Sequence, residues 1–209
     1  MVPLVKALKE EVLPLIHVVL EPKRFLSLHQ QPVSTFPRQQ ARAKEAKWIP
    51  PDLHSFKTNF DGAMFTDTGK ASLGVVIQDH AGEIITAFSE KIPQPPSVTY
   101  LELLAARGVA IFVHKVGLQD SILEGDSEIV INSLQKGDMF QSAYGHLFKD
   151  TLFYVHSLRS FSFSHSYRKG NSVPDALAKK ASFCSNLTVW MEYVPSDINT
   201  FVLADKPSS

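Results

Sequence analysis

Phe56–Met64 (FKTNFDGAM) is the stretch that decides the fold, because it alternates as a strand does and two more strand-like runs follow it. Those runs are Leu73–Gln78 (LGVVIQ) and Ile84–Ile92. Between them, Asp79–Glu83 (DHAGE) contains a glycine, which is typical of a hairpin turn. The sequence therefore predicts three antiparallel strands in succession.

A long helix is predicted next, over Val98–Val116, because its apolar residues recur at the spacing of one helical face. Gly117 is well suited to end that helix. Two more strands are predicted, at Ser121–Asp126 and at Arg159–Tyr167, where aromatic residues alternate with serines. Shorter helices are predicted at Ser127–Leu134, Ala143–His156 and Ser172–Phe183. Hairpin strands followed by helical crossovers indicate an α/β fold with a mixed sheet.

Charge divides the 209-residue chain into unlike parts. Residues 1–47 carry eight Lys/Arg against four Glu, whereas residues 48–209 carry 13 Lys/Arg against 17 Asp/Glu. We therefore predict a basic leader or linker over 1–47, a folded domain over 48–195 and a C-terminal tail over 196–209. The net charge of the whole chain is zero, which argues against a protein that grips nucleic acid by bulk charge.

Two classes of protein are excluded by composition. The single cysteine, Cys184, excludes an internal disulfide framework and a cysteine-based zinc site. The longest apolar stretch, Val12–Leu20, has nine residues and is too short to cross a bilayer. We expect no membrane partner and no signal peptide, with a nuclear or cytosolic location as the default.

Four acidic residues stand where predicted elements begin or end: Asp61, Glu102, Asp126 and Asp175. The carboxyl ends of central strands border the usual functional crevice of an open α/β sheet, so these side chains are candidates for one site. Crowded carboxylates repel one another unless a cation neutralises them. Mg²⁺ prefers such oxygen ligands, and two such ions can drive hydrolysis of a phosphodiester.

Six short stretches in fixed order resemble the ribonuclease H domain, most closely its plant-type, reverse-transcriptase-associated branch. They are Lys57–Ala63, Gly74–Asp79 with Gly82, Leu101–Glu102, Glu124–Ser127, Arg168–Asn171 and Asp175–Ala178. The resemblance covers about residues 48–195 and implies a five-stranded mixed sheet flanked by helices.

The resemblance also implies an activity, which is metal-dependent cleavage of the RNA strand in RNA–DNA hybrids. Two Mg²⁺ ions, or Mn²⁺ in their place, would serve as cofactors. Asp61 would bridge both ions, Glu102 and Asp126 would hold one, and Asp175 the other. Arg168 and Asn171 match the plant-type pattern, and they either contact nucleic-acid phosphate or order their loop.

Some features favour a second interpretation, a catalytically silent module of the same fold that derives from a retroelement and binds nucleic acid or protein. Pro174 directly precedes Asp175, and the region between residues 127 and 158 carries little positive charge. Glu124 either assists the site or is a solvated charge. An exonuclease of this fold is disfavoured, because Ala63 stands where such enzymes usually carry a second acid.

Overall fold

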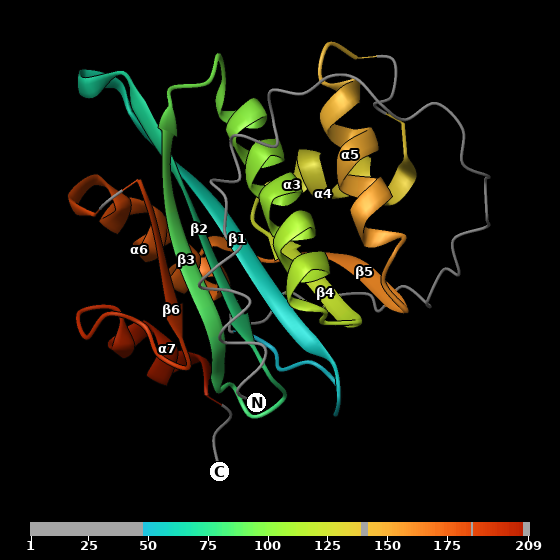
Figure 1. Cartoon of the computed structure of the whole chain (residues 1–209), viewed down its shortest axis with the longest axis vertical. Helices are drawn as coiled ribbons and strands as arrows, with labels where there is room; N and C mark the ends of the chain where they lie inside the picture. The colour runs from blue at the N-terminus through green and yellow to red at the C-terminus, as the bar shows by residue number, and fades with distance from the viewer. Residues whose placement is uncertain (1–47, 139–141, 185, 207–209) are drawn as a thin grey trace.

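The computed structural model of the chain describes residues 48–138, 142–184 and 186–206. The predicted basic leader, residues 1–47, lies outside these described residues. Six strands form one sheet in the order β5-β4-β1-β2-β3-β6 (Figure 1). Their bounds are β1 Phe56–Phe65, β2 Lys70–Gln78, β3 Ile84–Pro93, β4 Asp120–Gly125, β5 Ser160–His165 and β6 Leu187–Met191.

The sheet is mixed, as predicted. The pairs β1–β2, β2–β3 and β3–β6 are antiparallel, whereas β4 runs parallel to both β1 and β5. The hairpin between β2 and β3 turns at Gly82, whose φ of 75° suits glycine, and Asp79 Oδ1 accepts hydrogen bonds from two backbone N–H groups of the turn. The predicted hairpin is therefore confirmed.

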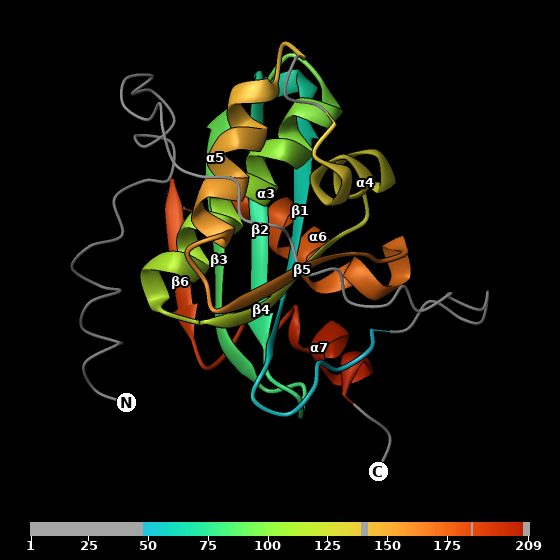
Figure 2. The same cartoon turned by 90° about the vertical axis from the view of Figure 1, so that its right-hand side faces the viewer.

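Helices cover both faces of the sheet (Figures 1 and 2). Helices α3, α4 and α5 lie on one face, over a core that includes Phe60, Leu103 and Ile111, while α6 and α7 lie on the other. Their bounds are α3 Val98–Val116, α4 Glu128–Lys136, α5 Gly145–Val155, α6 Ser172–Lys180 and α7 Asn199–Asp205. Among the described residues, no helix combines the length and apolar character needed to cross a membrane.

Helix α3 has the predicted bounds, and both of its ends have a local cause. Ser97 accepts a hydrogen bond from the Tyr100 N–H at 3.1 Å, which caps the first turn. Gly117 takes a φ of 74° and ends the helix in the left-handed conformation. The predicted last helix is shorter than expected, because α6 ends at Lys180 and a 3-10 turn follows over Ala181–Phe183.

The expected count of five strands is corrected to six. Strand β6 extends the β3 edge of the sheet, and its five residues are too few to show a clear alternation in the sequence. The predicted tail over 196–209 contains helix α7, whose Val202 is buried against the second core together with Ile198 just before the helix. Strand β6 pairs with residues about a hundred positions earlier in the chain, and α7 packs beside α6, which precedes it by about 25 positions.

Helix α6 sits unusually close to the sheet at Gly74 of β2. A Cβ atom at this position would overlap the backbone of Pro174 and Ala178. Two serine hydroxyls of the sheet donate hydrogen bonds to α6 carbonyl groups, Ser72 to Ala178 at 2.5 Å and Ser89 to Leu177 at 2.6 Å. Pro174 lies in the first turn, where its missing N–H costs nothing, so the helix begins before it and carries Asp175 on its first turn.

Candidate metal centre

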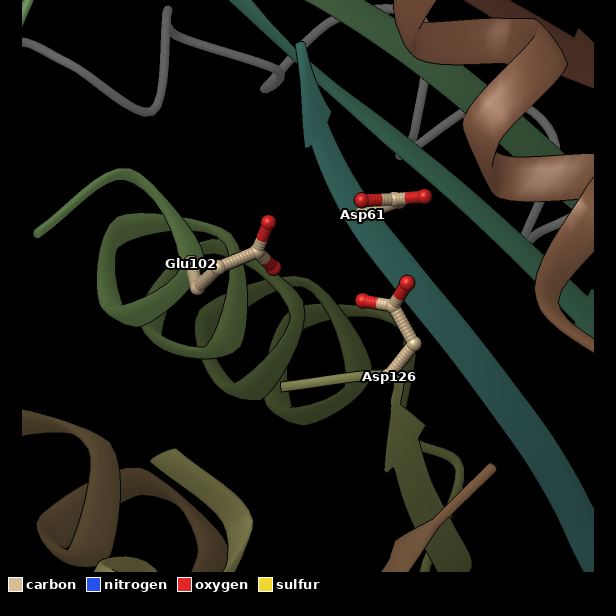
Figure 3. A group of neighbouring side chains, drawn as sticks. All are labelled: Asp61, Glu102 and Asp126. Atoms are coloured by element: carbon tan, nitrogen blue, oxygen red, sulfur yellow. The ribbon is translucent and has the colours of Figure 1, made fainter. Parts of the chain in front are cut away.

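Three of the predicted acids converge beside the carboxyl end of β4. Asp61 lies on β1, Asp126 directly follows β4, and Glu102 lies near the start of α3 (Figure 3). Since Phe60 of β1 pairs with Gly125 of the parallel strand β4, the residues that follow these two stand side by side. One carboxylate oxygen from each acid lies within 4.8 Å of the other two.

Burial makes this cluster electrostatically costly. Asp61 and Glu102 are each only 5% exposed. The pKa of Asp61 is raised from its ordinary 3.8 to about 7, mainly by burial and then by the charges of Asp126 and Asp175, while a hydrogen bond from the Gly62 N–H acts in the opposite direction. Burial likewise raises the pKa of Glu102 from 4.5 to about 9, with Asp61 and Asp126 acting in the same direction.

One oxygen of the cluster lacks a partner among the described residues. Glu102 Oε2 is buried and takes part in no hydrogen bond there. An unsatisfied buried carboxylate oxygen is costly, and a divalent cation would satisfy it. All three donors are carboxylate oxygens, which is the ligand set that suits Mg²⁺ or Mn²⁺.

The fourth acid, Asp175, stands apart from this group. Its Oδ2 lies 2.6 Å from Lys179 Nζ, one helical turn further along α6. It is nevertheless close enough to raise the pKa of Asp61. The structure thus brings Asp61, Glu102 and Asp126 together, and it leaves Asp175 beside them in an ion pair.

Comparison with known families identifies the fold independently. Residues 59–181, more than half of the chain, match the family model described as reverse transcriptase-like. The chain belongs to the reverse transcriptase-like family. No curated protein matches it significantly.

Solved structures similar to this reverse transcriptase-like chain are RNase H domains. RNase H1 of the archaeon Halobacterium salinarum is 24% identical, with a TM-score of 0.57 over 62% of this chain and 98% of that one. An N-terminal RNase H domain of Mycobacterium tuberculosis, solved as a fusion with maltose-binding protein, is 18% identical, with a TM-score of 0.54 over 61% and 92%. The chain therefore contains an RNase H-like domain with a mixed α/β sheet.

A third solved structure comes from a larger viral protein. The foamy viral protease-reverse transcriptase, in complex with an RNA/DNA hybrid, is 14% identical, with a TM-score of 0.51. The match covers 80% of this chain and 25% of the viral one. At this level of identity the likeness establishes the shared fold.

In this reverse transcriptase-like domain, Arg168 and Asn171 have different surroundings. Arg168 is 85% exposed in its side chain, and its Nε lies 3.8 Å from Asp126 Oδ2 at the rim of the acidic cluster. Asn171 is fully buried, donates to the Phe60 carbonyl at 2.9 Å and accepts from Asn59 at 3.2 Å. The assignment of Asn171 to nucleic-acid contact is therefore corrected, because its side chain orders the loop from inside the protein.

Glu124 is the residue that sequence analysis interpreted least well. The structure shows a buried side chain that pairs with Lys57 at 3.0 Å, both being 6% exposed, so a solvated charge is ruled out. A signal was present in the sequence, since Lys57, Asn59 and Asp61 alternate along one strand, and Glu124 stands two residues before Asp126. Alternation predicts that such residues share a face, but it does not say whether that face is covered.

Proposed function

We propose that this chain is a metal-dependent endonuclease that cleaves the RNA strand of RNA–DNA hybrids by a two-metal-ion mechanism. The observation that carries the proposal is the convergence of Asp61, Glu102 and Asp126 within 4.8 Å, with a buried Glu102 oxygen left for a ligand. Such a constellation is unfavourable without a cation and is suited to one.

The four acids would divide the ligand positions between them. Asp61 would help to hold both ions, Glu102 and Asp126 would hold one of them, and Asp175 would hold the other once its carboxylate leaves Lys179. When bound, the ions would activate a water molecule and stabilise the leaving oxygen of the phosphodiester. Asp61 and Glu102 must release the protons that their raised pKa values retain before they can act as ligands.

Arg168 would meet the phosphate of the substrate. Its guanidinium is exposed at the rim of the cluster, 3.8 Å from Asp126. From there it could form an ion pair with a backbone phosphate of the bound nucleic acid. A hybrid as substrate is supported by the fold shared with RNase H domains and with the viral reverse transcriptase solved on an RNA/DNA hybrid. The 2′-OH of the RNA strand would distinguish it from DNA.

A cleavage assay tests the proposal directly. A labelled RNA–DNA hybrid is incubated with the full chain and Mg²⁺, and the wild type is compared with Asp61→Asn. Asp67→Asn, at an exposed aspartate in the 3-10 turn between β1 and β2, is the matched control. We expect cleavage by the wild type and the control and loss of cleavage in Asp61→Asn. Equal cleavage by all three proteins would refute the assigned site.

One observation favours the second candidate function, a catalytically silent nucleic-acid- or protein-binding module. Lys179 Nζ forms an ion pair with Asp175 Oδ2 at 2.6 Å. The carboxylate proposed to hold the second metal ion therefore already has a cationic partner within the protein. If the wild type is folded and does not cleave in either Mg²⁺ or Mn²⁺, while it still binds the hybrid, this second function replaces the first.

A further inference from the structure

A buried hydrogen-bonded network lies beside the acidic cluster, on the face of the sheet that α6 covers. Asn59 is its centre. Its amide nitrogen donates to Glu124 Oε1 at 2.9 Å and to Asn171 Oδ1 at 3.2 Å, and its oxygen accepts from Trp48 Nε1 at 3.1 Å. Lys57 closes the network through its ion pair with Glu124. Each of these five side chains is at most 6% exposed.

The network is continuous with the candidate ligands along two strands. Asn59 lies two residues before Asp61, and Glu124 lies two residues before Asp126. Residues two apart on a strand share a face, so Asn59 and Asp61 form one row on β1, and Asp126 follows Glu124 just beyond the end of β4. The Lys57–Glu124 ion pair and the Asn59–Glu124 hydrogen bond join these two strands side chain to side chain.

Asn171 connects this network to α6. It is the residue immediately before the helix, yet its side chain does not cap the helix, although asparagine is among the residues best suited to do so. Instead, it is fully buried and bonds to Asn59 and to the Phe60 carbonyl of β1. Because Asp175 lies four residues later, one turn of helix separates the anchored residue from the fourth acid.

We propose that Asn171 is a positioning residue for Asp175, which ties the first turn of α6 to β1 so that the fourth carboxylate stands at a fixed place beside Asp61. The Lys57–Glu124 ion pair holds Asn59, and Asn59 holds Asn171. The inference rests on the proposed function, since it assigns Asp175 to a metal ion. Close packing of Gly74 on Pro174 and Ala178 restrains the same helix from the neighbouring strand.

Both segments that flank the family match reach this network. Trp48, before residue 59, donates to Asn59. Asp205, at the end of α7 and beyond residue 181, is 8% exposed, hydrogen-bonds to Gln78 and interacts electrostatically with Glu124 and Lys57. The positioning unit therefore extends past the part of the chain that the family model covers.

Titration of Mg²⁺ into the full chain by calorimetry tests the proposal without reference to activity. Loss of a side chain that orients a metal ligand typically weakens binding by about 10- to 100-fold. We expect roughly tenfold weaker Mg²⁺ binding in Asn171→Ala and a smaller loss in Asn171→Ser, which keeps a hydroxyl. Asn199→Ala, at an exposed asparagine that begins α7, is the matched control and should bind as the wild type does.

A double-mutant cycle separates positioning from general damage to the fold. In an Asp175→Asn background, Asn171→Ala should cause no further loss of Mg²⁺ affinity, because the ligand it positions is already gone. Thermal unfolding of each variant shows which of them are folded, and the Ser variant serves if the Ala variant is not. An equal loss in both backgrounds, or none in either, would overturn the inference. Failure of the wild type to bind Mg²⁺ would instead overturn the proposed metal site.

Discussion

Replacing Glu102 with glutamine should make the metal-free protein more stable at neutral pH. Burial and two neighbouring carboxylates raise the pKa of Glu102 to about 9, so the folded protein keeps this group protonated at pH 7. In the unfolded chain the same group ionises near its ordinary pKa of 4.5. Glutamine resembles the protonated acid in shape and in hydrogen bonding, and it carries no such penalty.

The magnitude follows from proton linkage. Holding a proton at pH 7, some 2.5 pH units above the ordinary pKa, costs the folded state roughly 3 kcal/mol at about 1.4 kcal/mol per unit. This cost is absent below the ordinary pKa, where both states are protonated, and it grows as pH rises toward 9. We therefore expect Glu102→Gln to raise the free energy of unfolding by about 2–3 kcal/mol at pH 7, and the gain to vanish near pH 4.

Urea unfolding with EDTA, at several pH values between 4 and 8, measures this difference. Glu128→Gln, at an exposed acid in the first turn of α4, is the control and should change the free energy of unfolding by no more than about 0.5 kcal/mol. Adding Mg²⁺ should stabilise the wild type more than Glu102→Gln, because the variant lacks a ligand. A Glu102→Gln protein that is less stable than the wild type at pH 7, or that keeps the same pH dependence, would refute the reasoning.

Three further outcomes are expected. Mg²⁺ binding at pH 7 should release about one to two protons, because Asp61 and Glu102 have pKa values of about 7 and 9. Calorimetry in buffers of different ionisation enthalpy counts these protons, and a release of none would contradict the raised pKa values. Gly74→Ala should destabilise the protein by about 3 kcal/mol, because its Cβ would overlap the α6 backbone, whereas Gly69→Ala, at a φ of 62° with open space around it, should cost about 1 kcal/mol. Equal melting temperatures for the two variants would count against close packing of α6. Burial raises the pKa of Asp205 to about 7, so the stability that its protonated form provides is lost as pH rises from 4 to 7. In thermal unfolding, Asp205→Asn should remove this pH dependence, and Asp197→Asn, at an exposed aspartate, should leave it in place.

Local patterns along the chain were enough to predict most of the elements. Val98–Val116 has the same bounds in the sequence prediction and in the structure, because an apolar helical face, a serine cap and a terminal glycine all act within one segment. The three hairpin strands were found for the same reason. Strand β6 and helix α7 were not predicted, because β6 is stabilised by pairing with β3 and α7 by packing on the second core. Neither interaction produces a recognisable pattern within the short segment itself.

For the candidate site too, some features were predictable from the sequence and others depended on tertiary structure. The chemical nature of the cluster follows from residue types and their order, since three predicted acids come together and carboxylates suit a divalent ion. The state of each charge depends on what covers it. Asn171 is buried where the start of α6 packs on β1, and Glu124 is buried beside Lys57 and Asn59 of the same strand. Asp175 pairs with Lys179 because the two meet on one helical face. Local chemistry can be recognised from neighbours in the chain, whereas burial and partner choice arise from residues far apart in sequence that only folding brings together.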